Sequence, residues 1–357
     1  MTYLSKSYCI YPPCCTFYDT MTMYHNNKRK LLLALWLVVS AALNFHIFFK
    51  PNTTKAKTIV MGSHTVLHMP ALPVRTKPLV LLGFPFLCEL DLLHIKLQLL
   101  SDVVSFFVIS ESCFTQSGHP KPLHFNLSKH EPRFQAYQAQ IWHITDCEPP
   151  PNTDNQLGWL HTDKVKSNIG LALFQIHDAS VVIVGDSDEV PSAKAVQWLV
   201  HESPLSSTYE FESSMPHYIY NFQWRVRPSG YSTMTARSAL LERQFWEAKR
   251  KGTALEQTIL PLPPAVAEGG FHCSYCLHYE EMNEKIHAAN TVDGALILGR
   301  YQWKPETLRA LKGCGVTPQG TQCELQPLLL LNLSVFEQQY PHLFEVPQCV
   351  PFNLPFQ

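Results

Sequence analysis

The stretch VVIVGDSDEVPS, residues Val181 to Ser192, decides how the rest of the sequence is interpreted. Four β-branched residues are followed by a glycine and then by Asp186, Asp188 and Glu189 within four positions. An apolar run without polar alternation is typical of a strand buried on both faces. The carboxylates then emerge at the carboxyl end of this strand, where they repel one another unless a cation or hydrogen-bond donors neutralise them. A turn that leads into a helix capped by Ser192 is the alternative interpretation.

The segments before this strand alternate between two periodicities. Short apolar runs predict strands, and runs with apolar residues at helical spacing predict helices between them. This order predicts an α/β fold with a mostly parallel central sheet, in which ligands bind at the carboxyl ends of the strands. The predicted strands are 78–86, 105–112 and 140–147, and the predicted helices are 88–104 and 161–177.

An Asp-x-Asp pair at a strand end indicates a metal site. Mg²⁺ and Mn²⁺ prefer carboxylate oxygens and commonly pair with substrate phosphates. Asp186 and Asp188 therefore suggest a divalent metal that holds the diphosphate of a nucleotide-sugar donor. His272 is a candidate third ligand, because imidazole binds Mn²⁺, and a structural histidine bonded to the backbone is the alternative.

The N-terminal part carries a targeting pattern. Residues 31–49, LLLALWLVVSAALNFHIFF, follow a basic cluster and are interrupted only by Ser40, Asn44 and His46. About 20 apolar residues span a bilayer, so we expect a single transmembrane signal anchor through which the protein attaches to the membrane. The expected organisation is a cytoplasmic tail at 1–30, the anchor at 31–49, a lumenal stem at 50–77 and a catalytic domain at 78–357. A buried helix of a soluble protein is the alternative for 31–49.

Sequons and cysteines agree with a lumenal catalytic part. The glycosylation sequons at Asn52, Asn126 and Asn332 all follow the predicted anchor. Eight cysteines follow it as well, an even number that favours disulfides in an oxidising compartment. The CSYC spacing alone also suits a redox or zinc motif, but a zinc site needs a second such pair. The disulfide candidates are Cys88, Cys113, Cys147, Cys273, Cys276, Cys314, Cys323 and Cys349.

Charge and composition exclude some classes of function. The chain has 357 residues, of which 46% are hydrophobic, so it can bury a large core. The 28 basic residues are balanced by 29 acidic residues. We expect no nucleic-acid partner, because no basic field is present to hold a polyanion.

Several stretches together resemble a known family. DSDEVPS from Asp186, YIYNFQWR from Tyr218, GGFHCSYCL from Gly269 and FEVPQCV near the C-terminus follow a long block that begins at Glu89. In this order they resemble glycosyltransferase family 17, and the likeness covers residues 82–350. The His-Cys-Ser-aromatic-Cys element and the long block carry most of the specificity.

The resemblance implies a single-pass type II Golgi membrane enzyme with a GT-A-like catalytic domain in the lumen. It implies inverting transfer of GlcNAc from UDP-GlcNAc to a mannose of N-glycans on glycoproteins, with a β-1,4 bond of the bisecting type and a divalent metal, usually Mn²⁺. Asp186 and Asp188 match the metal–diphosphate motif. Glu111 and Asn168 are then expected to contact the nucleotide.

Inversion requires a group that accepts the proton of the acceptor hydroxyl. The candidates are Glu189, Glu268, Glu280 and Glu281. For the last two, a solvated charged face of a helix over EEMNEK is the alternative.

The aromatic residues of YIYNFQWR alternate with period two, as in a strand with one aromatic face. Trp224 and Arg225 are the candidates for contact with a sugar, whereas Tyr218 and Phe222 are expected in the core.

Two other functions stay open at this point. One is a non-catalytic, membrane-anchored glycan-binding protein that keeps the fold. The other is a transferase with a different sugar donor or acceptor. Protection of the protein against heat by UDP and metal distinguishes the donor-binding enzyme from the glycan-binding protein.

Overall fold

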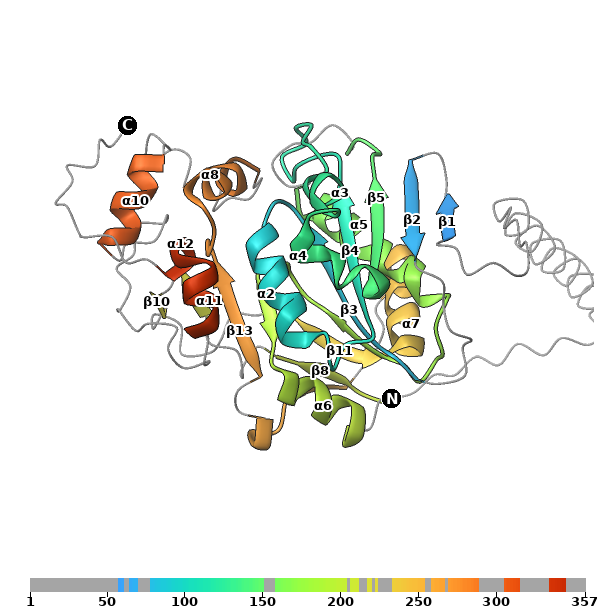
Figure 1. The fold of residues 1–357 in the computed structure, drawn as a ribbon. Coiled ribbons are helices and arrows are strands. Elements are labelled where there is room, and N and C mark those ends of the chain that lie inside the picture. The colour runs from blue at the N-terminus through green and yellow to red at the C-terminus, as the bar shows by residue number, and fades with distance from the viewer. Residues whose placement is uncertain are drawn as a thin grey trace, which may run out of the picture. The chain divides into compact units, whose positions relative to one another are not determined.

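A mixed nine-stranded sheet forms the centre of the fold (Figure 1). The computed structural model describes residues 57–60, 64–69, 78–150, 158–203, 206–211, 217–219, 222–223, 233–253, 258–266, 269–288, 305–314 and 334–344. The strands follow the order β1-β2-β5-β4-β3-β6-β11-β8-β12. Their bounds are β1 Lys57–Val60, β2 Thr65–Met69, β3 Val80–Phe86, β4 Phe106–Ser112, β5 Ile141–Asp146, β6 Val181–Val184, β8 Thr208–Glu210, β11 Thr235–Ser238 and β12 Ile259–Pro261.

The four neighbouring strands β5, β4, β3 and β6 run parallel and are buried on both faces. Helix α2 (Leu90–Leu100) covers one face and helix α5 (Gly158–Leu173) covers the other. Gly83 lets α5 approach β3 closely, because a Cβ at this position would lie 2.5 Å from Cγ2 of Ile169. The apolar runs of the sequence thus become the buried parallel centre of the sheet.

The prediction of a mostly parallel sheet is wrong. Strand β11 pairs antiparallel with both β6 and β8, and β2 pairs antiparallel with β5. Antiparallel neighbours need no helical crossover between them. The prediction rested on an alternation of strands and helices that ends at Val184. The strands β2, β11 and β8, on the two sides of the parallel centre, join the sheet by antiparallel pairing instead.

A second sheet has four strands in the order β10-β9-β13-β7. Its strand β7 follows β6 directly in the chain. The short strand β7 (Glu189–Pro191) pairs antiparallel with β13 (Gly270–Ser274), which places Glu189 opposite His272. Gly270 has φ 143°, and a Cβ there would lie 2.1 Å from the Val190 carbonyl oxygen. The other two strands are β9 His217–Ile219 and β10 Phe222–Gln223.

The remaining helices flank the two sheets (Figure 1). Ser192 caps α6, because its Oγ accepts a hydrogen bond from the Ala195 N–H. The helix cap by Ser192, which belongs to the alternative interpretation given above, is therefore present together with the buried strand. The bounds are α3 His124–Ser128, α4 Pro132–Gln135, α6 Ala193–His201, α7 Ala239–Arg250, α8 Tyr279–Ala288, α10 Pro305–Gly313, α11 Ser334–Gln339 and α12 Pro341–Phe344, with 3₁₀ helices η1 Gln138–Gln140 and η3 Pro264–Val266.

The fold class also needs correction at the predicted transmembrane helix. Within the described ranges, no helix is long and apolar enough to cross a membrane. The longest helix there, α5, has 16 residues, whereas a bilayer span needs about 20. The predicted anchor at 31–49 and the tail at 1–30 lie outside the described residues.

Two strands fall within the segment expected to be a stem. β1 and β2 form an antiparallel pair, and β2 continues the large sheet through β5. The reason is visible in TVLHM, where Leu67 and Met69 are buried in the core on the α5 face of the sheet.

The cysteines divide into several groups. Cys113 pairs with Cys147 just beyond the ends of β4 and β5, and Cys273 pairs with Cys276. Cys314 is also disulfide-bonded. Cys88 is a free, buried thiol whose Sγ lies 3.8 Å from the Glu281 carbonyl oxygen, so its prediction as a disulfide partner is wrong. Cys323 and Cys349 lie outside the described residues.

One of the three sequons is described. Asn126 lies in α3, and its side-chain oxygen accepts a hydrogen bond from Nζ of Lys129. Asn52 and Asn332 lie outside the described ranges.

Candidate active site

A pocket of about 270 Å³ lies at the carboxyl ends of β3, β4 and β6. Such crevices are where open α/β sheets bind their ligands. Strand β13 and helix α8 supply further wall residues. The polar and charged residues that line the pocket are Glu89, Ser112, Gln116, Lys121, His161, Thr162, Asp186, Ser187, Asp188, His272 and Lys285.

Asp186 is the more exposed aspartate of the pair, with 32% of its side chain accessible. Lys166 Nζ lies 2.7 Å from Oδ1, and the Thr233 hydroxyl donates to Oδ2 at 3.0 Å. The buried Lys96 donates to the Asp186 backbone oxygen at 3.2 Å. Burial opposes the charge of Lys166, but Asp186 raises the pKa of Lys166 above its usual value. Two lysines therefore hold the first aspartate at the pocket wall.

Asp188 is held by a third lysine. Lys285 Nζ lies 2.8 Å from Oδ2 of Asp188 and 2.9 Å from Oε1 of Glu89, and His272 Nε2 lies 3.4 Å from Oδ1. Although burial alone would raise it, Lys285 and His272 hold the pKa of Asp188 well below its usual range. In the described structure, lysines thus supply the positive charge that the crowded carboxylates require.

Glu189 stabilises the turn between β6 and β7. It is fully buried, its Oε2 accepts the Asp186 N–H at 2.7 Å, and its Oε1 accepts the Thr233 N–H at 2.5 Å. Gly185 leaves room for this carboxylate, since a Cβ there would lie 2.7 Å from Oε2. Burial and the Asp186 charge raise the pKa of Glu189. Glu189 is absent from the lining of the described pocket, and its hydrogen bonds position the turn that carries Asp186.

The two other described base candidates lie on α8. Glu280 is exposed, and Oε2 of Glu281 accepts the His278 N–H at 3.2 Å. Neither side chain lines the pocket formed by the described residues. Glu268 lies outside the described ranges. The expected solvated face is only part of α8, because Lys285 on the same helix reaches into the pocket wall.

Burial raises the pKa of Glu281 to about 7. This carboxyl therefore stabilises the fold below its unfolded pKa near 4.5, and that stability is lost as the pH rises through about 7. A Glu281→Gln variant, which retains an acceptor oxygen for His278, should match the wild type at pH 4.5. At pH 8.5 it should be more stable by about 2 kcal/mol, a value reduced for partial exposure of the side chain. Urea unfolding in EDTA at both pH values measures this difference, and equal stability at pH 8.5 contradicts the raised pKa.

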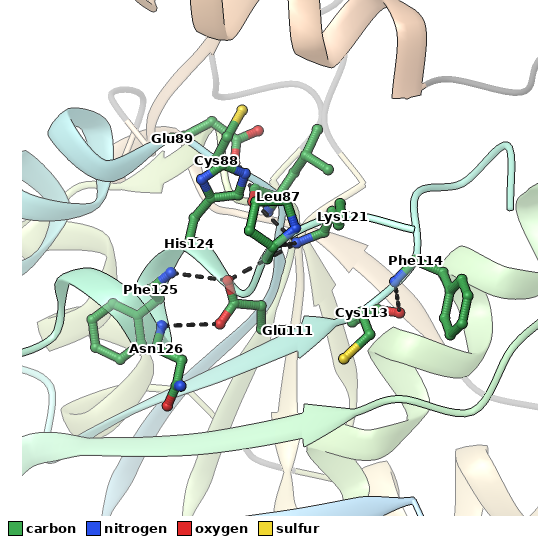
Figure 2. Close-up of polar contacts among 12 residues, drawn as sticks. Leu87, Cys88, Glu89, Glu111, Cys113, Phe114, Lys121, His124, Phe125 and Asn126 are labelled. Carbon is green, nitrogen blue, oxygen red and sulfur yellow. Dashed lines mark hydrogen bonds and ion pairs between the residues drawn. The ribbon is translucent and has the colours of Figure 1, made fainter. Parts of the chain in front are cut away.

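Glu111 is buried behind the pocket instead of lining it. Figure 2 shows its carboxylate at the start of α3, where the N–H groups of Phe125 and Asn126 donate to it at 2.9 and 3.2 Å. His143 Nε2 lies 3.0 Å from Oε2, and Lys121 Nζ lies 3.9 Å from Oε1. Groups of the protein itself thus occupy the Glu111 carboxylate, which was expected to contact the nucleotide.

A Glu111→Gln variant separates these two roles. The amide group turns one acceptor oxygen into a donor that faces other donors, so we expect a loss of stability of about 1–3 kcal/mol. Because Glu111 is absent from the pocket lining, UDP affinity should stay within about twofold of the wild type, about 0.4 kcal/mol. Chemical denaturation and calorimetric UDP titration measure the two quantities. A large loss of UDP affinity in a stably folded variant would restore the nucleotide-contact interpretation.

The other predicted donor and sugar contacts have different outcomes. Asn168 donates from Nδ2 to Oδ2 of Asp146 at 2.9 Å, at the end of β5, and is buried away from the described pocket lining. Its neighbour Lys166 makes the contact with Asp186 instead. Trp224 and Arg225 lie outside the described residues.

The predicted metal ligands lie in the wall of one pocket. Asp186, Asp188 and His272 all line it, and two carboxylates with one imidazole are a donor set that suits Mn²⁺. Their ligand atoms are less tightly gathered than those of Asp91, His278 and His342, which form the described group with all ligand atoms within 4.8 Å of one another. The two carboxylates and the imidazole of the pocket fit a divalent ion. In this structure Lys166 and Lys285 bind the two carboxylates, Asp186 and Asp188.

Sequence reasoning missed four charged or titratable residues of the pocket. Glu89 stands at the N-cap position of α2 without a capping side-chain hydrogen bond, and its Oε2 accepts the Cys88 N–H at 3.1 Å. Lys121 lines the pocket between Glu111 and the Leu87 carbonyl oxygen, to which it donates at 3.3 Å. The other two are His161 and Lys285. Of these four residues, only Glu89 could be noticed in the sequence. Its position directly before an apolar helical run indicates the start of a helix.

Comparison with known proteins relates this chain to a group of transferases. The sequence profile of the family described as Glycosyltransferase family 17 matches residues 52–298. Proteins named beta-1,4-mannosyl-glycoprotein 4-beta-N-acetylglucosaminyltransferase are similar to it, from Homo sapiens (27% identical over 265 residues), Rattus norvegicus (27% over 265) and Mus musculus (28% over 264). Each comparison covers 67% of this chain and 48% of the relative. The chain thus spans about half the length of the curated relatives it matches.

Proposed function

The chain belongs to glycosyltransferase family 17, and from this membership together with its pocket we propose that it transfers GlcNAc from UDP-GlcNAc to a mannose of an N-glycan. The bond formed is β-1,4, and the anomeric carbon is inverted. The names of the relatives, which state a β-1,4-mannosyl-glycoprotein acceptor and a transferred N-acetylglucosamine, support this choice of donor sugar and acceptor.

One observation carries the proposal. Asp186 and Asp188 stand in the wall of the pocket at the carboxyl end of β6, which is the position where α/β sheets bind nucleotides. Lys121 adds an ammonium group to the same wall, and a lysine ammonium is a point charge that phosphate oxygens bind. The pocket therefore offers both signs of charge to a nucleotide-sugar diphosphate.

The charge balance around the aspartates supports a divalent cation. Four carboxylates face three ammonium groups, so this cluster has no surplus of positive charge for a diphosphate. We propose Mn²⁺, held by Asp186, Asp188 and His272; when bound, it neutralises the diphosphate of the departing UDP. The groups counted are Glu89, Asp186, Asp188 and Glu189 against Lys96, Lys166 and Lys285.

The residues around the aspartates prepare the site for this ligand. Glu189 accepts the backbone N–H of Asp186, the Thr233 hydroxyl donates to the Asp186 side chain, and Lys285 keeps Asp188 ionised. An ionised, hydrogen-bonded Asp188 suits cation binding better than proton abstraction, because its low pKa makes it a weak base.

A lumenal position in the Golgi is part of the proposal. The disulfide between Cys113 and Cys147 joins the ends of two central strands, and disulfides persist in oxidising compartments.

A transfer assay tests the proposed function. The full chain is incubated with Mn²⁺, a biantennary N-glycan and either UDP-GlcNAc or UDP-galactose, and the glycan mass is read. We expect a gain of one N-acetylhexosamine with UDP-GlcNAc, and no gain in EDTA. A gain only with UDP-galactose indicates a different donor. Binding of the glycan without any transfer favours the non-catalytic glycan-binding function.

A further inference from the structure

Three side chains from distant parts of the chain meet outside the pocket. Asp91 lies in α2, His278 directly precedes α8, and His342 lies in α12. Nε2 of His342 lies 2.9 Å from Oδ2 of Asp91, and Nε2 of His278 lies 3.5 Å from the same oxygen. None of the three lines the pocket described above.

The imidazole rings of the two histidines are stacked on each other. The rings of His278 and His342 stack with centroids 3.4 Å apart and planes 14° from parallel. Nε2 of His342 is buried and, despite its short distance from Asp91, makes no hydrogen bond of normal geometry. One ligand atom from each of Asp91, His278 and His342 lies within 4.8 Å of the other two, a grouping that could hold a metal ion.

Neighbouring groups hold these side chains in place. Arg133 pairs with the other carboxylate oxygen of Asp91, Oδ1, which leaves Oδ2 facing the two histidines. Lys312 Nζ donates to the backbone oxygen of His342 at 2.8 Å, and the His278 N–H donates to Glu281. The Arg133 contact is of the kind that orients a ligating carboxylate and strengthens metal binding, and the other two fix the backbone of the histidines.

We propose that Asp91, His278 and His342 bind one divalent transition-metal ion of the zinc class. Two imidazole nitrogens and one carboxylate oxygen, each from a different segment, form a ligand set typical of Zn²⁺. His278 is about half exposed, so water can complete the coordination and the ion can reach the site from solvent. The ion cross-links α2, the start of α8 and α12, which ties the C-terminal part of the chain to the core.

Zinc binding by the full, untagged chain tests the proposal. The protein is stripped with EDTA, dialysed against Zn²⁺, and its zinc content is measured beside that of four variants. We expect one zinc per chain that is lost in His278→Ala and His342→Ala. The ion should remain in His130→Ala, which removes an exposed histidine elsewhere, and in Asp188→Asn, which alters the pocket.

A second measurement keeps the result independent of folding defects. Zinc should raise the melting temperature of the wild type and of Asp188→Asn, and should leave that of His278→Ala unchanged. Arg133→Gln, which removes an orienting contact, should weaken zinc affinity by about 10- to 100-fold. Equal zinc content and equal thermal shift in His278→Ala and the wild type overturn the proposal. Loss of the zinc in Asp188→Asn also overturns it, because the ion then belongs to the pocket.

Discussion

Transfer of GlcNAc is expected to fall by about 100- to 1,000-fold when Asp188 is changed to asparagine. Asparagine keeps the size of the side chain and removes the charge that lines the pocket between Lys285 and His272. Lys285 keeps Glu89 as a partner, so the fold should survive the change. The loss should therefore appear in turnover with UDP-GlcNAc and Mn²⁺, measured at saturating N-glycan.

A matched control separates the site from a general effect of removing an aspartate. Asp178 pairs with Arg243 and has 64% of its side chain exposed. Asp178→Asn should retain turnover within about twofold, a difference of about 0.4 kcal/mol. Wild-type turnover in a folded Asp188→Asn variant contradicts a role of this carboxylate in the reaction.

Replacing Lys285 with methionine is expected to destabilise the protein by about 3–5 kcal/mol. Lys285 bridges Asp188 and Glu89, and its removal leaves two buried carboxylates without their shared cation. Burial works against the ammonium charge, but Asp188 and Glu89 raise the pKa of Lys285 well above its usual value. Because 21% of the side chain stays accessible to water, we expect the lower end of that range.

Urea unfolding at pH 7 measures this loss, with Lys251→Met as its control. Lys251 also pairs with a glutamate, Glu247, but both side chains are more than half exposed. That variant should change the free energy of unfolding by about 0.5 kcal/mol or less. If Lys285→Met loses no more stability than Lys251→Met, the ion pairs of Lys285 do not hold the pocket wall together.

The position of the candidate site could be predicted because it depends on local pattern. Val181–Val184 has no polar alternation, which predicts a buried strand with the aspartates at its carboxyl end. The helical spacing of 90–100 and the capping by Ser192 are equally local. These elements place the pocket without any knowledge of distant contacts.

The partners of the aspartates could not be predicted in the same way. Lys285 belongs to EEMNEK, which as a helix has the composition of a solvated charged face. The pairing of β13 with β7, in which Gly270 fits against Val190, brings the chain segment that leads into α8 beside the residues that follow β6. The role of Lys285 is therefore a property of the tertiary fold.

The partners of Glu111 also depend on the tertiary fold. Glu111 ends a strand beside the pocket, as a nucleotide contact would, yet α3 begins directly above it. The unpaired N–H groups at a helix start are strong ligands for a carboxylate. Without the position of α3, the sequence could not distinguish a carboxylate that binds a helix end from one that binds a substrate.

Calorimetric titration of UDP into the full chain with Mn²⁺ tests the donor pocket most directly. We expect saturable binding of one UDP per chain, loss of that binding in Asp188→Asn, and unchanged binding in Asp178→Asn. Binding that is equally strong in both variants, or no binding to the folded wild type, would contradict the assignment of the nucleotide-sugar site to the pocket at the end of β6.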